Sequence, residues 1–524
     1  MLNSLSESLG MEIFKSLRSS PFRVLLLDYG LPNKTIFRRG TILSLSLLLS
    51  KYIREKFPES RIGVILPPGM LGFVANFALF LCGRVPLNLN FTLGAKVNTQ
   101  IMNDAGVKTI LTASVLMQKF PDFPWPKNCI LLDEFLREIA SSRLLLIKTF
   151  LSAWLFPARV IRQYQVISQG GESTAALLFT SGSSGVPKGV PLSHVNLLEN
   201  CRQLHGLKLF DNQAKVLVNL PLFHSFGMTV GMIFSTLRGL LLVSTPSPLD
   251  HRLNIRAIYE EKVQILLGTP TFLRGYLKKA SAKELGSIRY VVAGAEKSPS
   301  SFRKRWESEN NCEYLEGYGL TEASPAISFN LPGKGKKSGS VGRLLKGVEC
   351  RTIDPVDGSE TDTKKGGVLC FRGPNIFSGY WLDEKSTNEA LDSQGWLKTG
   401  DVGRIDADGF LWIEGRISRF SKIGGEMVPH ARIEEEILDL MGFSSSEEQV
   451  LVVTAVQDDQ KGEKLVVVST LKLDQIKIRQ ALSSRQIPKI WIPKHFIEVK
   501  KIPVLPSGKI DWLGVQKTFT RQDR

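Results

Sequence analysis

The chain has 524 residues, which is too long for one compact core. Its composition, 43% hydrophobic and 22% charged residues, excludes a disordered or fibrous protein. Its formal net charge of +17 suits an acidic protein, an anionic lipid surface or a phosphorylated substrate. The positive charge is not gathered in one terminal tail or in a stripe interleaved with aromatic residues, which argues against a dedicated nucleic-acid binder.

Apolar runs of strand length alternate with helix-compatible sequence through the first part of the chain. The N-terminal residues show no basic region followed by an apolar stretch, so no secretory signal is expected. Helices are predicted at 69–83 and directly after Ser193, whose hydroxyl can cap the second one. Because nearly continuous apolar strands separated by helices are typical of parallel sheets, we expect an α/β fold with two layered subdomains. The predicted buried strands are 61–67, 175–180, 240–245, 263–270 and 288–296.

A short apolar segment, LLLIKTFLSAWLF at 144–156, stands between these elements. It is shorter than the roughly 18–20 residues that a membrane-spanning helix needs. Lys148 interrupts it, and Arg143, Arg159 and Arg162 flank it. Two interpretations remain open: a helix lying in a membrane interface with its basic flanks on lipid headgroups, or an ordinary buried helix.

The pattern changes in the last third of the chain. Short strands broken by glycine predict a β-rich subdomain at about 335–415. Beyond Arg416, a helix at 431–441 and strands at 449–456 and 464–473 predict a compact, mobile α+β domain. The domains expected are therefore 1–417, which includes the β-rich subdomain, and 418–524.

The stretch FTSGSSGVPKGV at 179–190 follows a predicted buried strand and has few side chains to pack. A glycine-rich turn in this place lets backbone N–H groups approach phosphate oxygens, and Lys188 adds a positive charge. Its spacing differs from that of the P-loop, and a loop of this composition can also be a flexible surface turn. The predicted phosphate cradle consists of Thr180, Ser181, Gly182, Ser183, Ser184, Gly185 and Lys188.

TSGSSGVPKG resembles the phosphate loop of the adenylate-forming (AMP-binding) superfamily, which includes acyl-CoA synthetases, luciferases and peptide-synthetase adenylation domains. Five further segments follow in that superfamily's order: PLFHSFGMT at 221–229, AGAEK at 293–297, EGYGLTEASP at 316–325, WLKTGDVGRID at 396–406 with GRISRFSKIGGEMV at 415–428, and LPSGKID at 505–511. With GTPTFL and GPNIFSGY, they are most similar to the ligase half of bacterial acyl-acyl-carrier-protein synthetase / 2-acylglycerophosphoethanolamine acyltransferase. None of the six histidines has the aspartate of the acyltransferase motif H-x4-D, so we expect the ligase alone.

The resemblance implies a reaction in two steps, with ATP and Mg²⁺ as cofactors. A fatty-acid carboxylate would attack the α-phosphate of ATP and form an acyl-adenylate, and a phosphopantetheine thiol would then take the acyl group. Thr321 would bond the phosphate, and Glu322 would hold the metal ion. The other nucleotide-binding residues implied are Gly294, Ala295, Glu296, Tyr318 and Gly319 near the adenine, and Asp401 and Arg416 near the ribose.

A mobile lysine is implied as the main catalytic group. Lys509 in PSGK would neutralise the charge that develops during adenylation, and the C-terminal domain would then rotate about a hinge at Ser418, where relatives usually carry Asp or Lys. After that rotation Lys422 would face the nucleotide. His224 would lie where the acyl tunnel meets the thiol channel. The acyl pocket is implied for Phe226, Gly268, Thr269 and Pro270.

We therefore expect a long-chain fatty acid–acyl-carrier-protein ligase of the bacterial cytoplasm, with peripheral contact to the inner face of an anionic membrane left open. CoA as the thiol acceptor remains an alternative. The residues after 450 include 14 Lys and Arg but only 7 Asp and Glu, and this positive charge suits an acidic carrier protein and CoA phosphates alike. Glu322 could instead cap a turn, and Asp401 could close its own Thr-Gly-Asp turn. A non-catalytic scaffold is a remote alternative, since Lys188 and Lys509, which would serve only chemistry, are present.

Overall fold

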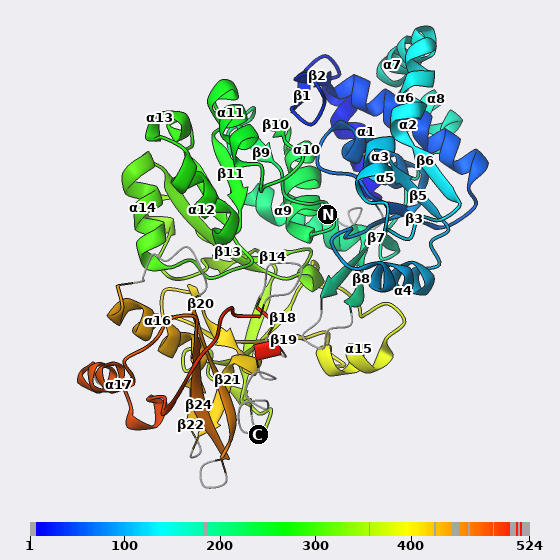
Figure 1. Cartoon of the computed structure of the whole chain (residues 1–524). Helices are drawn as coiled ribbons and strands as arrows, with labels where there is room; N and C mark the ends of the chain where they lie inside the picture. The colour runs from blue at the N-terminus through cyan, green and yellow to red at the C-terminus, as the bar shows by residue number, and fades with distance from the viewer. Residues whose placement is uncertain are drawn as a thin grey trace. The chain divides into compact units, whose positions relative to one another are not determined.

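The computed structural model describes residues 7–181, 187–355, 357–423, 426–442, 450–458, 462–485, 487–503, 510–511 and 514–515 (Figure 1). The chain divides into two compact units. The first comprises Met1–Ser298, Trp306–Glu349 and Phe371–Leu397, and the second comprises Pro299–Arg305, Cys350–Cys370 and Lys398–Arg524. The domain boundary at residue 418 stays a prediction.

A nine-stranded sheet forms the centre of the first unit, and its order is β15-β14-β13-β12-β11-β9-β10-β1-β2. The strands from β13 to β1 in this order run parallel, as the sequence predicts, and the flanking strands run antiparallel. Ligands of parallel sheets bind beyond the carboxyl ends of the strands, so the loops after β11, β12 and β13 are placed for function. The strands are β1 (Val24–Asp28), β2 (Thr35–Arg38), β9 (Lys215–Val218), β10 (Leu241–Ser244), β11 (Ile265–Gly268), β12 (Tyr290–Ala293), β13 (Glu313–Gly319), β14 (Ala326–Phe329) and β15 (Arg343–Leu344).

A smaller parallel sheet and a hairpin complete the strands of the first unit. The parallel sheet has the order β4-β3-β5-β6, and the hairpin pairs β7 with β8. The strand predicted at 175–180 lies in this hairpin and not in either parallel sheet. The strands are β3 (Arg61–Val64), β4 (Val85–Asn88), β5 (Thr109–Thr112), β6 (Asn128–Leu131), β7 (Thr174–Ser181) and β8 (Pro187–Ser193).

Helices surround these sheets, and both predicted helices are present. The first is α3, which is buried along nearly its whole length and ends at Gly83 with φ 70°. The second is α9, where Ser193 Oγ accepts a hydrogen bond from Asn196 N at 3.1 Å and Asn196 Oδ1 accepts one from Ser193 N at 3.0 Å. The helices are α1 (Leu9–Ser19), α2 (Arg39–Lys56), α3 (Met70–Cys82), α4 (Ala95–Ala105), α5 (Ser114–Lys119), α6 (Leu132–Ser141), α7 (Arg143–Leu155), α8 (Pro157–Gln163), α9 (His194–Gly206), α10 (Ser235–Arg238), α11 (His251–Glu261), α12 (Pro270–Lys279), α13 (Ala282–Leu285), α14 (Ser300–Asn310), α15 (Glu384–Ala390) and the π-helix η1 (Phe226–Phe234).

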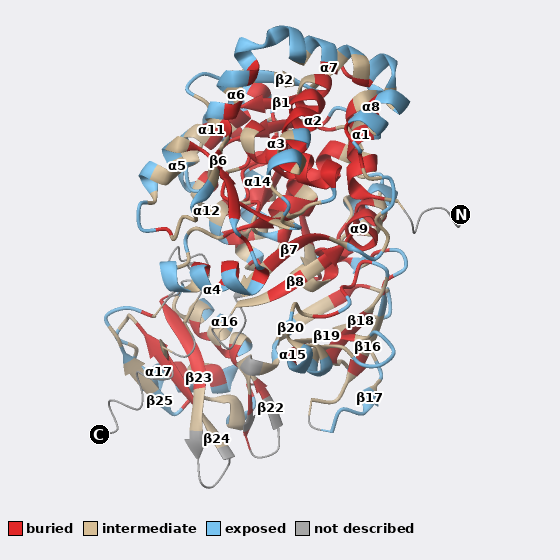
Figure 2. Ribbon diagram, turned by 90° about the vertical axis from the view of Figure 1, so that its right-hand side faces the viewer, coloured by how far each residue is buried: buried red, intermediate tan, exposed pale blue. Residues whose placement is uncertain are grey.

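Helix α7 corresponds to the apolar segment at 144–156, and the buried interpretation of that segment is wrong. The helix packs on α2 through Thr149 and Ala153, which are buried and one turn apart, and through the Phe150 ring, which lies against Gly40 of α2. Most of its other large apolar side chains are exposed, among them Leu144 at 79%. Figure 2 shows α7 as an exposed helix over the buried α2. No helix in the described part of the chain is long and apolar enough to cross a membrane.

The second unit carries two sheets and a hairpin. A five-stranded sheet of order β17-β16-β18-β19-β20 lies where the sequence predicts a β-rich subdomain, and a three-stranded sheet of order β23-β24-β25 packs against α16 and α17 in a hydrophobic core of its own. The helix predicted at 431–441 and the two strands after it are α16, β23 and β24. The elements are β16 (Glu349–Ile353), β17 (Glu360–Thr361), β18 (Gly367–Arg372), β19 (Leu397–Ile405), β20 (Leu411–Arg416), β21 (Phe420–Ile423), β22 (Glu426–Pro429), β23 (Leu451–Asp458), β24 (Gly462–Ser469), β25 (His495–Glu498), α16 (His430–Leu440) and α17 (Gln475–Ser484).

Candidate active site

The β7–β8 hairpin holds both ends of the predicted phosphate loop. Thr180 pairs with Lys188 across the hairpin, and Ser181 pairs with Pro187. Two residues from opposite ends of the motif therefore stand side by side where the strands end. Gly182, Ser183, Ser184 and Gly185 lie outside the described residues, as does the side chain of Ser181.

A tyrosine that the sequence analysis did not single out connects Lys188 with Glu322. The Nζ atom of Lys188 lies 4.9 Å from the centroid of the Tyr380 ring, within the range of a cation–π contact. The hydroxyl of Tyr380 donates a hydrogen bond to Glu322 Oε1 at 2.8 Å. The implied phosphate lysine and the implied metal ligand thus share one neighbour. Tyr380 is the last residue of GPNIFSGY, and that segment was the available signal for it.

Buried asparagines fix the turn that carries Thr321 and Glu322. Asn375 Nδ2 donates to the carbonyl oxygens of Ala323 at 2.9 Å and Ala326 at 3.0 Å. Asn200 Nδ2 donates to the same Ala326 oxygen at 2.8 Å. Because these amides satisfy the carbonyls of an irregular turn, they hold the backbone in one conformation. Neither residue was singled out from the sequence: Asn375 lies in the quoted segment GPNIFSGY, and Asn200 lies outside the quoted motifs.

The PLFHSFG segment lies beside this turn. Ser225 Oγ is 3.4 Å from Thr321 Oγ1, which brings two elements far apart in sequence together. His224 is exposed, and its ring centroid lies 4.8 Å from that of Phe223. The segment continues into the π-helix η1, a rare element that often occurs at functional sites. Gly227 is required there, because a Cβ atom at this position would lie 2.3 Å from the Pro221 carbonyl oxygen.

The predicted acyl-pocket and adenine-pocket residues meet at the carboxyl ends of β11 and β12. A Cβ atom at Gly294 would lie 3.9 Å from the Phe226 ring and 3.5 Å from the Gly317 carbonyl oxygen, so Phe226 borders Gly294. Gly268 ends β11, and Thr269 and Pro270 then begin α12, with Thr269 Oγ1 accepting from Phe272 N at 3.4 Å. The structure therefore places all four residues implied for the acyl pocket in one region of the first unit.

The AGAEK loop has a structural contact that the sequence analysis did not predict. Glu296 Oε2 accepts hydrogen bonds from Thr271 N at 3.1 Å and Thr271 Oγ1 at 2.6 Å, which ties the loop to the start of α12. Ala295 adopts φ +68°, a conformation that favours glycine. Tyr318 lies on the next strand, β13, and its ring centroid is 5.9 Å from that of Phe371.

The implied ribose ligand belongs to the second unit. Asp401 is buried on β19, and Arg416 lies opposite on β20 and donates from Nε to Asp401 Oδ1 at 2.9 Å. Asp401 N donates to Thr399 Oγ1 at 3.0 Å, so the Thr-Gly-Asp turn is closed by the threonine hydroxyl and not by the aspartate side chain. Ser418 lies in a short 3₁₀ turn and Lys422 on β21, but their side chains are outside the described part. Lys509 also lies outside the described residues, and its role stays a prediction.

The donor set at Glu322 fits Mg²⁺. Among the described residues no group of three His, Cys, Asp or Glu side chains could hold a metal ion. Magnesium ions that serve nucleotide chemistry are bound by one or two carboxylates together with water and substrate phosphates. Glu322, with the Thr321 hydroxyl beside it in the same turn, is such a partial ligand set. A bound Mg²⁺ ion would neutralise phosphate charge there.

The comparisons with known proteins show the family. Residues 48–381 match the family model described as AMP-binding enzyme, and the chain belongs to this family. A curated relative, the mitochondrial medium-chain acyl-CoA ligase ACSF2 of Bos taurus, is 30% identical over 347 residues, which is 63% of this chain. The match covers only 55% of that relative's length, little more than half.

Solved structures show the fold over nearly the whole chain. ATP-bound MatB from Rhodopseudomonas palustris has a TM-score of 0.78 and 21% identity, and covers 98% of this chain and 99% of that one. The O-succinylbenzoate CoA synthetase MenE of Bacillus subtilis, in complex with ATP and magnesium, has a TM-score of 0.77 and 22% identity, and covers 95% and 98%. The predicted mixed α/β fold, with a large N-terminal and a smaller C-terminal part, is confirmed. Enzymes of this family use ATP and Mg²⁺, which confirms the two predicted cofactors at the level of the family.

The Tyr380 contact predicts a specific loss of activity. Tyr380→Phe removes the hydrogen bond to Glu322 and keeps the ring beside Lys188. We expect ATP–pyrophosphate exchange to fall between about tenfold and a hundredfold, since a hydrogen bond to a charged group contributes about 1.5–3 kcal/mol. Tyr259→Phe on α11 is the matched control, because Tyr259 lies on the surface of the same unit. Full exchange activity in Tyr380→Phe would show that the hydroxyl does not position Glu322.

Proposed function

We propose that this protein is an AMP-forming acid–thiol ligase that activates a fatty acid. In the first step a carboxylate oxygen bonds to the α-phosphorus of ATP, the bond to the bridging oxygen breaks, and pyrophosphate leaves. In the second step a thiol sulfur bonds to the acyl carbon, its proton is released, and AMP leaves as the thioester forms. The observation that carries the proposal is the Lys188–Tyr380–Glu322 arrangement in a chain of the AMP-binding family.

The residues of the first unit meet the electrostatic demand of the first step. Two anions must approach each other, so the site has to supply positive charge where charge develops in the transition state. Lys188 and Thr180, at the end of the hairpin, would contact the terminal phosphates of the nucleotide. Glu322 would hold the magnesium ion, and Thr321 would donate its hydroxyl to a phosphate oxygen. Asp401, in the second unit, would accept hydrogen bonds from the ribose hydroxyls, since a carboxylate has only acceptors.

CoA is the acceptor that the relatives support better than a carrier protein. The curated relative matched here is named an acyl-CoA ligase, and MenE is named a CoA synthetase. Acyl carrier protein remains a second candidate, because of the resemblance of the motifs and because Lys500 and Lys501 are exposed and would suit an acidic partner. The carboxylic acid substrate would be a fatty acid, because its apolar tail suits the region bordered by Phe226 and Pro270.

A single-turnover assay tests this proposal. Purified protein is supplied with ATP, Mg²⁺ and labelled palmitate, and then with CoA or phosphopantetheinylated acyl carrier protein in separate reactions. We expect the acyl-adenylate to form first and the label to move to CoA. If the label moves to the carrier protein and not to CoA, acyl carrier protein is the acceptor and the preference for CoA is wrong. If no acyl-adenylate forms with any fatty acid tested, the proposed function is wrong.

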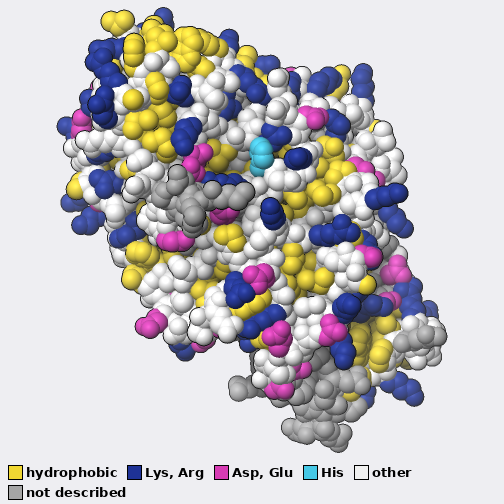
Figure 3. All heavy atoms as spheres, turned by 180° about the vertical axis from the view of Figure 1, so that it is seen from behind, with side chains coloured by type: hydrophobic (Ala, Val, Ile, Leu, Met, Phe, Trp, Pro, Cys, Tyr) yellow, Lys and Arg dark blue, Asp and Glu magenta, His cyan; other side chains and the backbone are white. Residues whose placement is uncertain are grey.

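We also propose that α7 docks the protein on an anionic membrane. Its outward side chains form an exposed apolar patch, which Phe22 extends by stacking edge-on against Trp154 at 5.0 Å. Figure 3 shows hydrophobic side chains gathered at the upper left of that view with Lys and Arg along the edge. The patch consists of Phe22, Leu144, Leu145, Ile147, Leu151, Trp154, Leu155 and Phe156.

The charges around this patch match an anionic lipid surface. Arg143, Lys148, Arg159 and Arg162 are all exposed, and the sequence has no Asp or Glu from residue 139 to residue 171. An apolar helix with basic flanks inserts into the headgroup boundary and gains electrostatic attraction from anionic lipids. A protein partner would need acidic groups around an apolar groove, and a second copy of this patch would bring like charges together.

Vesicle sedimentation measures this docking. We expect Leu151→Glu to weaken binding to vesicles of phosphatidylcholine and phosphatidylglycerol at least about tenfold, because a buried carboxylate at the interface opposes both insertion and attraction. Leu249→Glu is the control, since Leu249 is 67% exposed outside the patch. Adenylation of a soluble short-chain fatty acid should not change. Equal vesicle binding by both variants, or a dimer that only Leu151→Glu dissociates, would overturn the proposal.

A further inference from the structure

A cavity lies in the first unit, beside the amino ends of strands of the nine-stranded sheet, whereas the predicted nucleotide site lies at the carboxyl ends. Its volume is about 520 Å³, a size typical of small-molecule sites. Arg23 directly precedes β1, Asn212 lies before β9, and Gly239 lies before β10, and all three line the cavity. Because β1, β10 and β9 are parallel neighbours, these residues mark the amino ends of the strands. The nucleotide residues follow the carboxyl ends, so this cavity is separate from the proposed active site.

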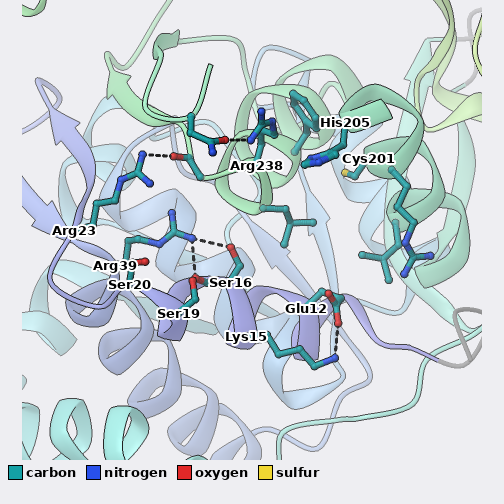
Figure 4. Close-up of a pocket in the computed structure, with 16 residues that line it drawn as sticks. Glu12, Lys15, Ser16, Ser19, Ser20, Arg23, Arg39, Cys201, His205 and Arg238 are labelled. Carbon is teal, nitrogen blue, oxygen red and sulfur yellow. Dashed lines mark hydrogen bonds and ion pairs between the residues drawn. The ribbon is translucent and has the colours of Figure 1, made fainter. Parts of the chain in front are cut away.

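Four arginines line this cavity, which we call the arginine cavity: Arg202, which is paired with glutamates, and three others. Arg23, Arg39 and Arg238 come from three different segments, and Figure 4 shows them around one space. A Cβ atom at Gly239 would lie 3.8 Å from Arg23 Nη1 and 3.9 Å from Arg39 Nη1, so two guanidinium groups converge beside this glycine. Like charges are held together here by the fold.

The charge of Arg39 has no counterion among the described residues. Its side chain is buried, and Nη2 donates to the neutral oxygens Ser16 O at 2.8 Å, Ser16 Oγ at 2.7 Å and Thr236 O at 3.3 Å. Its Nε atom is buried and has no hydrogen-bond partner in the described part of the chain. Burial, and then the positive charge of Arg23, lower the pKa of Arg39 to about 10, so it is still charged at neutral pH. A buried charge without a counterion is unfavourable, and an anion would remove that cost.

Among the described residues, Arg23 and Arg238 also donate only to neutral groups. Arg23 Nη2 donates to Gly239 O at 2.8 Å. Arg238 Nη2 donates to Phe210 O at 2.8 Å, and its Nη1 donates to Asn212. These contacts aim the guanidinium groups without neutralising them.

The remaining charged residues of the cavity are already paired. Glu12 accepts from Lys15 Nζ at 2.7 Å. Arg202 forms ion pairs with Glu199 at 2.5 Å and with Glu7 at 2.6 Å. Glu12 of the lining and the nearby Glu7 and Glu199 are therefore paired with other cations, and the charge left over among the described residues is that of Arg23, Arg39 and Arg238.

We propose that the arginine cavity binds a phosphate group. A phosphate carries up to two negative charges and several acceptor oxygens, and the planar fork of donors on arginine matches it. The group would lie between Arg23 and Arg39, with Arg238 closing the site. It belongs either to a small soluble phosphate compound or to a phospholipid headgroup, and both sources share this chemistry. Phosphate binding in the arginine cavity does not depend on the adenylation reaction, so this proposal is independent of the proposed function.

Two arms of one experiment distinguish these sources. In the first, full-length protein is saturated with α,β-methylene-ATP and Mg²⁺, to occupy the nucleotide site, and titrated with inorganic phosphate in a calorimeter. In the second, vesicles of phosphatidylcholine with and without phosphatidic acid are tested in the Leu151→Glu background, so that α7 does not dominate. Arg23→Gln and Arg238→Gln are compared with Arg252→Gln, an exposed residue of α11 outside the cavity.

We expect saturable binding in at least one arm, weakened about tenfold or more in Arg23→Gln and Arg238→Gln, and unchanged in Arg252→Gln. Binding of phosphate in the first arm supports a soluble ligand, and binding only to vesicles with phosphatidic acid supports a lipid headgroup. These two arginines are half-buried, so their variants avoid the folding risk of replacing the buried Arg39. Absence of binding in both arms, or equal binding by all variants, would overturn the proposal.

Discussion

Lys509→Ala is expected to slow pyrophosphate exchange strongly while the protein still consumes preformed acyl-adenylate. The family resemblance places this lysine over the α-phosphate during adenylation only, so its loss should raise one barrier and spare the other. Removal of one preorganised donor from a developing charge slows a reaction by about 10²–10³-fold, and we expect an effect of this size on the first half-reaction. ATP–pyrophosphate exchange measures that step, and thioester formation from synthetic acyl-adenylate measures the second.

Two further variants give this experiment its contrast. Lys472→Ala removes an exposed lysine from the same part of the chain and should leave both half-reactions intact. Lys422→Ala should show the reverse selectivity, since Lys422 is implied to face the nucleotide during the second step. Equal loss of both half-reactions in Lys509→Ala would mean that the protein does not alternate between two poses.

Glu322→Gln is expected to reduce adenylation about a hundredfold at low magnesium concentration. Glutamine keeps the shape of the side chain and can still accept the hydrogen bond from Tyr380, but it removes the negative charge that attracts Mg²⁺. We therefore expect the magnesium concentration for half-maximal rate to rise, with partial recovery of rate at high magnesium. A magnesium titration of pyrophosphate exchange measures both effects.

Glu384→Gln is the matched control for this variant. Glu384 is exposed in the first turn of α15, in the same unit as Glu322, and the structure gives it no role in the site. Its substitution should leave the magnesium dependence unchanged. An unshifted magnesium requirement in Glu322→Gln would remove Glu322 from the metal site and leave it as a structural partner of Tyr380.

The parallel sheet could be predicted from sequence because its strands are buried on both faces. Such strands consist of uninterrupted apolar residues, as in ILLG of β11 and YVVA of β12, and the loops after them carry the motifs. Helix α9 could be predicted for a local reason, since Ser193 and Asn196 satisfy each other's backbone. Both patterns can be predicted because all the residues that form them lie within a few positions of one another in the sequence.

Contacts between distant segments could not be predicted in the same way. The apolar composition of α7 fits a buried helix and an exposed one equally well, and its exposure depends on Thr149, Phe150 and Ala153 being the residues that face α2. Tyr380 meets Lys188 and Glu322 only after folding. The arginine cavity joins residues about 200 positions apart, and no single one of them forms part of a motif. Such sites follow from topology.

The π-helix η1 has a consequence for how the chain tolerates length changes. A π-helix closes its hydrogen bonds one residue later than an α-helix, so it accommodates an additional residue without lengthening the element. Loss of one residue between Phe226 and Phe234 would convert it into an ordinary α-helix and leave the preceding PLFHSFG segment near its present orientation relative to the buried Met232. His224 would then keep its direction. A single-residue deletion there should yield a folded protein whose site is still assembled.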